Sequence, residues 1–160
     1  MSEPVLDRRV RWAATLSILA LALGLRVWNI DGGVPYAVGV DEPQLVDRAL
    51  RMMRTGDFHP HFFDYPSLYI YVQLLVAIAT FLVGAIVGHY PTLASFTGAD
   101  FYPVARWVTA LFGVATVALT LRIGERFDWR AGIVGALLLA VMPMHVRESH
   151  FVLTDVPMTF

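Results

Sequence analysis

The sequence predicts an all-α membrane protein built from several apolar helices and an amphipathic helix at the membrane surface. Hydrophobic residues make up 57% of the 160 residues and charged residues only 16%, with a mean hydropathy of +0.60. Soluble domains are typically about 45–50% apolar and about 25% charged. The apolar residues are also concentrated in four runs, which approach the roughly 20 residues that a membrane-spanning helix needs.

The charged residues and the lack of cysteine exclude several classes of function. The formal net charge is −1 and no basic run is long enough to follow a phosphate backbone, so we expect no nucleic-acid partner. The sequence contains no cysteine, which excludes disulfides and thiol chemistry. All 12 basic residues are arginines, so the permanent cation of this chain is the planar guanidinium, a good partner for phosphate.

The apolar runs predict three membrane crossings and one further membrane-embedded helix. We expect the crossings at about residues 10–28, 104–121 and 127–146, and the further helix at 66–88. Arg26 and Arg106 fall near the ends of two crossings. We expect both side chains to snorkel toward the membrane interface.

The arginines also predict the orientation of the chain in the membrane. They precede the first apolar run and cluster again between the third and fourth runs, whereas the loop at 89–103 has none. Short loops rich in arginine tend to stay in the cytoplasm, which places the N-terminus there. Both arginine clusters can be cytoplasmic only if the helix at 66–88 dips into the outer leaflet and returns. Four plain crossings remain the alternative.

The first external loop, residues 29–65, is the least hydrophobic part of the chain. Asp41 followed by Gln44 has the spacing of a capping box, which predicts a helix over 42–55 that ends at Gly56. The helix is amphipathic, so we expect it to lie along the membrane surface.

Two histidines follow this helix, His59 and His61, close to Asp57. Imidazole and carboxylate groups together are able to bind a metal ion. The spacing of two residues around Pro60 differs from the usual helical spacing of metal ligands, and a structural or interfacial role is favoured.

Several short motifs then follow one another in order along the chain. An Asp41-Glu42 pair heads the surface helix, a Tyr-Pro-Ser-Leu helix entry comes next, and an arginine-rich turn leads to a span that ends in Pro-Met-His. The last motif is the segment 147–155, which ends in Asp155. This ordered set resembles the N-terminal module of the GT-C membrane glycosyltransferases. It is most similar to bacterial glycosyltransferase family 39 and to the dolichyl-phosphate-mannose–protein mannosyltransferases.

The resemblance implies a fold, an activity and a location. It implies an all-α GT-C-like module with amphipathic juxtamembrane helices in its first external loop, in a bacterial-type plasma membrane. Enzymes of this kind transfer a sugar from a polyprenyl-phosphate carrier to an acceptor on the extracytoplasmic face. The resemblance also implies that residues 1–160 are the N-terminal part of a longer enzyme and are inactive alone.

The resemblance further implies which residues form the site. Its two loop carboxylates map to Asp41, with Glu42 beside it, and to Asp155. A base is needed to activate an acceptor hydroxyl, and Asp41 is the candidate. Glu42 and Asp155 would orient the acceptor or a divalent ion, Mg²⁺ or Mn²⁺, held by Asp41 and Asp155. The leaving phosphate needs a cation, for which Arg147 is the first candidate. The substrate-binding candidates are Arg147, His150, His61 and Tyr65.

Other interpretations remain open. Asp41 and Asp155 could each serve only as helix caps. A non-catalytic polytopic protein, such as a transporter or an assembly subunit, would be favoured by four plain crossings without a shared acidic face. A transporter usually buries ionisable groups at the middle of the membrane, and the centres of these runs carry almost none. A flippase-like carrier binder would use a lipid groove without a base.

Overall fold

The structure, a computed structural model, describes residues 5–36 and 39–160, and this part of the chain contains helices and loops but no β-strand. The elements are α1 (Val5–Val27), α2 (Glu42–Thr55), α3 (Ser67–Ile86), the short 3-10 helix η1 (Leu93–Ser95), α4 (Gly98–Gly124), α5 (Trp129–Val141), α6 (Pro143–Glu148) and α7 (Asp155–Thr159). The all-α class is therefore confirmed. By length and composition α1, α3 and α4 are able to cross a membrane, which supports a membrane protein.

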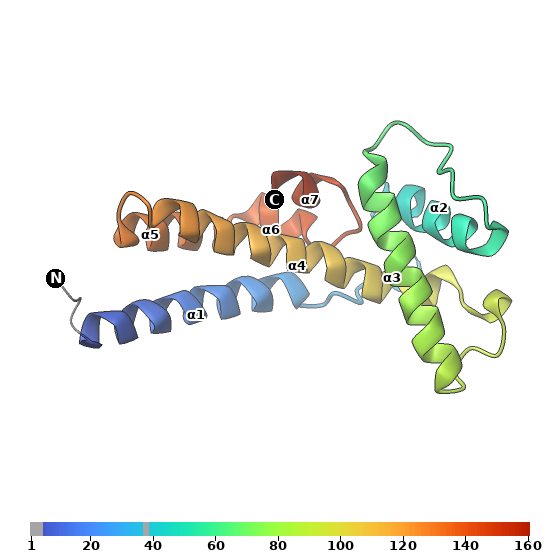
Figure 1. The fold of residues 1–160 in the computed structure, drawn as a ribbon, viewed down its shortest axis with the longest axis horizontal. Coiled ribbons are helices and arrows are strands. Elements are labelled where there is room, and N and C mark those ends of the chain that lie inside the picture. The colour runs from blue at the N-terminus through green and yellow to red at the C-terminus, as the bar shows by residue number, and fades with distance from the viewer. Residues whose placement is uncertain (1–4, 37–38) are drawn as a thin grey trace.

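The long helix α4 joins two bundles. Figure 1 shows α1, α4 and α5 side by side along the long axis, whereas α2 and α3 lie at one end of α4. The first half of α4 shares a buried apolar core with α2 and α3, which includes Leu45, Ile70 and Phe101. The second half shares another core with α1 and α5, which includes Ala22, Val117 and Ala136.

Helix α4 begins earlier than the predicted crossing at 104–121. The Thr97 amide and hydroxyl both donate to Asp100 Oδ2, at 2.8 and 2.6 Å, and this capping box starts the helix at Gly98. Arg106 therefore lies two turns inside the helix, and the residue is 1% exposed. The prediction that Arg106 snorkels to the interface is wrong, because the buried Glu42 carboxylate offers it a partner in the protein.

Arg26 is also buried rather than snorkelling, and its exposed fraction is 0%. Helix α5 ends at Val141 because Pro143 cannot continue it, which leaves carbonyl groups without helical partners. Arg26 donates to two of them, Ala140 O at 3.1 Å and Leu139 O at 3.3 Å. The end of α1 thus caps the end of α5.

The structure divides the predicted crossing at 127–146. Helix α5 has 13 residues and the extended backbone at Met142, with ψ of 115°, separates it from α6. At a rise of about 1.5 Å per residue α5 is roughly 20 Å long, short of the roughly 30 Å of a bilayer core. The predicted crossing at 127–146 is therefore not one continuous helix.

Helix α3 covers the segment that was expected to enter the membrane and return. It is one continuous helix of 20 residues, so the segment does not turn back on itself. Figure 1 shows α3 running steeply across the direction of α1, α4 and α5. Helix α3 is therefore not parallel to the α1–α4–α5 bundle (Figure 1).

Helix α2 has the predicted bounds, and Gly56 ends it with φ of 71° and an amide bond to Met52 O. The predicted capping box is wrong, because the Asp41 side chain makes no cap hydrogen bond. Pro43 in the first turn needs no amide partner, which lowers the demand for a cap.

The two arginine clusters meet at one end of the α1–α4–α5 bundle. Arg11 of α1 lies 3.8 Å from Glu125, and its guanidinium lies over the Trp129 ring at 5.9 Å. The start of α5 approaches α4 closely here, since a Cβ at Gly132 would lie 2.7 Å from Leu121 O. The shared end agrees with the argument that places both clusters on one side of a membrane.

Candidate functional site

A buried ion pair between Glu42 and Arg106 holds the acidic end of the molecule together. Arg106 Nε donates to Glu42 Oε1 and Arg106 Nη2 donates to Oε2, both at 2.8 Å. The side chains are 0% and 2% exposed. The remaining lone pairs of the carboxylate accept from the amides of Val152, at 2.9 Å, and Gly39, at 3.2 Å.

The third guanidinium nitrogen of Arg106, Nη1, contacts the loop that follows α1. Arg106 Nη1 donates to Ile30 O and to Gly32 O, each at 2.9 Å. The pair therefore fastens three segments to α4: the loop after α1, the start of α2 and the loop before α7. Glu42 is enclosed and fully hydrogen-bonded, so its carboxylate positions the neighbouring loops and does not reach a substrate.

Asp41, Tyr65 and Asp155 come together on the surface beside this pair. Asp41 directly precedes α2, Tyr65 lies just before α3, and Asp155 is the first residue of α7. A hydrogen bond with Asp41, desolvation, and the charges of Asp41, Asp155 and Asp64 raise the pKa of the Tyr65 phenol above 10. These acids share Tyr65 as a neighbour, and we call Asp41, Asp64, Tyr65 and Asp155 together the acidic cluster.

An apolar cavity of about 290 Å³ lies next to the acidic cluster. Pro66, which follows Tyr65, and Pro157, which lies two residues after Asp155, both line it. The rest of its wall comes mainly from apolar side chains of α3, α4 and α7, such as Leu68 and Phe112. A carboxylate-rich surface therefore adjoins an apolar hollow, an arrangement that suits an amphiphile with a polar reacting end.

Arg147 and His150 line a different cavity, of about 500 Å³, together with Arg106 and the loop after α1. The Arg147 side chain is 69% exposed, and its Nε lies 3.5 Å from Glu148 Oε1, so it is accessible to an anion. His150 is engaged differently. Its Nδ1 lies 2.8 Å from Val146 O and its Nε2 lies 3.1 Å from Trp28 O. Both ring nitrogens contact backbone carbonyls, so His150 ties α6 to the end of α1 and leaves no nitrogen for a phosphate.

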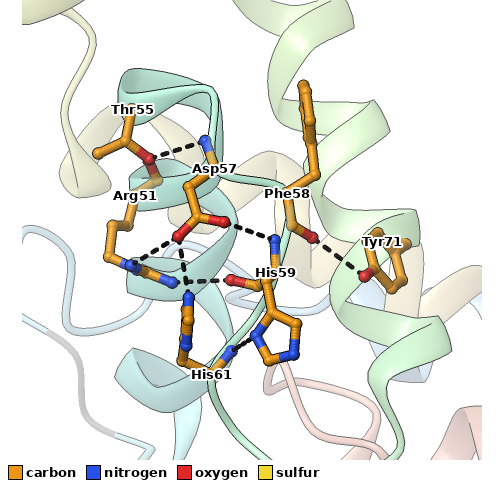
Figure 2. A network of polar contacts seen from close by, with 7 residues as sticks. All are labelled: Arg51, Thr55, Asp57, Phe58, His59, His61 and Tyr71. Atoms are coloured by element: carbon orange, nitrogen blue, oxygen red, sulfur yellow. Dashed lines mark hydrogen bonds and ion pairs between the residues drawn. The ribbon is translucent and has the colours of Figure 1, made fainter.

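His61 belongs to a separate polar network after α2, which Figure 2 shows. Its Nε2 lies 2.9 Å from Asp57 Oδ2, and its amide donates to His59 Nδ1 at 3.0 Å. Arg51 closes the network by donating to His59 O at 2.9 Å. Hydrogen bonds from the His59 amide and the His61 ring lower the pKa of Asp57. No contact in the described residues joins His61 to the acidic cluster, so a substrate role for His61 has no support from its position.

The acidic cluster gives an incomplete set of metal ligands. Within residues 5–36 and 39–160, no group of three or more His, Asp or Glu side chains is arranged to hold a metal ion. Mg²⁺ requires near-octahedral oxygen coordination. Asp41 and Asp155 alone supply only part of it, and we assign no step to a metal ion.

Two important residues were not identified as site residues from the sequence. The partner of Glu42, Arg106, lies 64 positions away, and only the burial of both side chains identifies the pair. Asp64 precedes Tyr65 directly and contributes charge to the acidic cluster. The sequence does point to Asp64, because it is the only acidic residue directly beside the Tyr-Pro pair that begins the next helix.

Comparison of this chain with models of protein families, with curated proteins and with solved structures finds no match in any of the three.

The buried pair makes a strong prediction for stability. We expect Glu42→Gln to destabilise the fold by about 3–5 kcal/mol, because Arg106 keeps its buried charge without a counter-ion. The matched control is Glu125→Gln, since Glu125 forms only half-exposed pairs with Arg11 and Arg122 and should change stability by less than about 1 kcal/mol. Denaturant unfolding in detergent, followed by tryptophan fluorescence, measures both. Equal losses would contradict the structural role of Glu42.

The acidic cluster makes a prediction for titration. Tyr65 should form phenolate at a higher pH than an ordinary tyrosine, and Asp41→Asn should lower its pKa toward 10 because the largest contribution is removed. The control is Asp31→Asn, which removes an exposed acid that does not act on Tyr65. Tyrosine ring NMR signals, assigned with Tyr65→Phe, report the titration. An unchanged Tyr65 midpoint in Asp41→Asn would show that the two side chains do not meet.

Proposed function

We propose that this chain belongs to a membrane glycosyltransferase that moves a sugar from a polyprenyl-phosphate carrier to an acceptor hydroxyl on the extracytoplasmic face. One observation carries the proposal. The segments that carry Asp41 and Asp155 lie near Tyr65, and Pro66 and Thr154, the chain neighbours of Tyr65 and Asp155, line an apolar cavity. Transfer from a lipid carrier needs both features, because the reacting end is polar and the carrier is not.

The roles follow from accessibility. Asp41 is half-buried, and its carboxylate makes no cap hydrogen bond to α2, so it is available to an acceptor. It acts as the base that takes the proton of the acceptor hydroxyl. Asp155 is exposed at the start of α7 and orients the acceptor. The apolar cavity beside them receives the first part of the polyprenyl chain.

The reaction balances without a further reactant. The acceptor oxygen bonds to the anomeric carbon of the sugar while the bond from that carbon to the phosphate oxygen breaks. The proton passes to Asp41 and the polyprenyl phosphate leaves as an anion. Arg147 is an exposed cation that lines the neighbouring cavity rather than the apolar one, and in this proposal it stabilises the negative charge that develops on the phosphate.

The proposal requires that both acidic loops face the same side of the membrane. Cysteine labelling is straightforward because the chain has no cysteine of its own. We expect Val40→Cys and Met158→Cys, at exposed positions beside the acidic cluster, to react with an impermeant maleimide in intact cells. Phe127→Cys, exposed at the opposite end, should react only after lysis. Labelling of positions 40 and 158 from opposite sides would contradict the shared face and favour a non-catalytic protein with four crossings.

The proposal also requires that Asp41 accelerates transfer. In membranes that contain the full-length protein, Asp41→Asn should lower the initial rate of hexose transfer from a polyprenyl-phosphate hexose by about 10²–10⁴-fold, the usual contribution of a general base. The matched control is Asp47→Asn, on the exposed side of α2, which should transfer at the unmodified rate. Unfolding midpoints verify that both variants fold. If Asp41→Asn transfers as fast as the control, Asp41 is not the base.

A further inference from the structure

The opposite end of the α1–α4–α5 bundle carries a third cavity, larger than the two described above. It measures about 810 Å³ and lies between α1 and the end of α4. Three guanidinium groups line it, from Arg11, Arg122 and Arg126, against the single carboxylate of Glu125. The cavity therefore has a formal charge of +2, and it lies far along α4 from the acidic cluster.

Apolar and basic side chains alternate along the wall of this cavity. Leu119, Arg122 and Ile123 lie on one face of α4, and Arg126 and Phe127 follow in the turn after the helix. Leu119 and Ile123 are 39% and 54% exposed, which leaves an apolar surface directly beside the guanidinium groups. Leu119 precedes all the cations of α4, so an apolar surface extends from the arginines toward the middle of the bundle.

Arg11 completes the cavity from the side of α1. Its guanidinium is oriented by Glu125, at 3.8 Å, and by the Trp129 ring, at 5.9 Å. Glu125 also lies 3.3 Å from Arg122. The carboxylate of Glu125 thus contacts two of the guanidinium groups that line the cavity.

We propose that this cavity binds an anionic phospholipid, with the phosphate at the arginines and the start of an acyl chain along Leu119 and Ile123. Guanidinium groups bind phosphate through paired hydrogen bonds. A free phosphate ion would match the cations but leave the exposed apolar stripe unused. A zwitterionic lipid would bring an ammonium group to a cavity that is already positive. Basic cavities between membrane helices are suited to anionic headgroups. The inference rests on the insertion of α1 and α4 into a bilayer, and it does not depend on the acidic cluster.

The test compares lipid retention by matched variants of the whole protein. The protein is reconstituted in phosphatidylcholine nanodiscs with and without a minority of phosphatidylglycerol, extracted in mild detergent, and analysed for bound lipid by native mass spectrometry. We expect Arg122→Gln/Arg126→Gln to retain about tenfold less phosphatidylglycerol, because two charge-assisted contacts are lost. Arg51→Gln/Arg54→Gln removes the same charge from exposed positions on α2 and should retain it fully.

A second variant separates a lipid from a free anion. Leu119→Ser/Ile123→Ser leaves all the arginines in place and should still lower retention of phosphatidylglycerol. Unfolding midpoints with added glycerol 3-phosphate should rise less than with phosphatidylglycerol. Retention by Arg122→Gln/Arg126→Gln equal to that of the α2 control would overturn the proposal. Equal stabilisation by glycerol 3-phosphate would also overturn it, since the cavity would then bind phosphate without a lipid chain.

Discussion

The buried pair of Glu42 and Arg106 is the interaction on which the acidic end of this protein depends. Removing both charges from water costs several kcal/mol per ion, and only good geometry and complete hydrogen bonding offset that cost. Both conditions are met, because the carboxylate accepts four hydrogen bonds and the guanidinium also donates to two carbonyls. The pair cannot form unless three separate segments are already in place. It therefore couples the position of the loop at Asp41 to that of the loop at Asp155.

A second buried arginine, Arg26, connects α1 to α5 in a similar way. Arg26 joins α1 to the carbonyl groups at the end of α5, and Arg106 joins α4 to the loops beyond it. Each guanidinium donates hydrogen bonds to backbone carbonyls at a helix end or in a loop, where regular helical partners are lacking. In an apolar chain such open carbonyls are costly to bury, and arginine, with five donors in a plane, satisfies several of them at once. The helix packing of this protein depends on these polar connections as well as on its two apolar cores.

The sequence predicts some parts of this structure well and others poorly, for physical reasons. The bounds of α2 follow from local signals, namely the amphipathic pattern and Gly56. The shared end of the arginine clusters follows from their spacing along the chain. The burial of Arg26 and Arg106 does not follow, because it depends on partners far away in the sequence. The pairing of Asp41 with Tyr65 was likewise not predictable from spacing, although both residues were candidates for the site.

The Asp41-Glu42 pair shows why two adjacent acids have different roles. At the start of a helix successive side chains point in directions about 100° apart, so two neighbours cannot both face the core. Glu42 turns inward to Arg106, and Asp41 remains outside beside Tyr65. The longer side chain reaches the buried guanidinium, and the shorter one remains next to the surface where an acceptor would bind. Exchanging the two residues would place a shorter carboxylate in the core, too short to pair with Arg106 in the same way. The order Asp-Glu therefore has a structural reason.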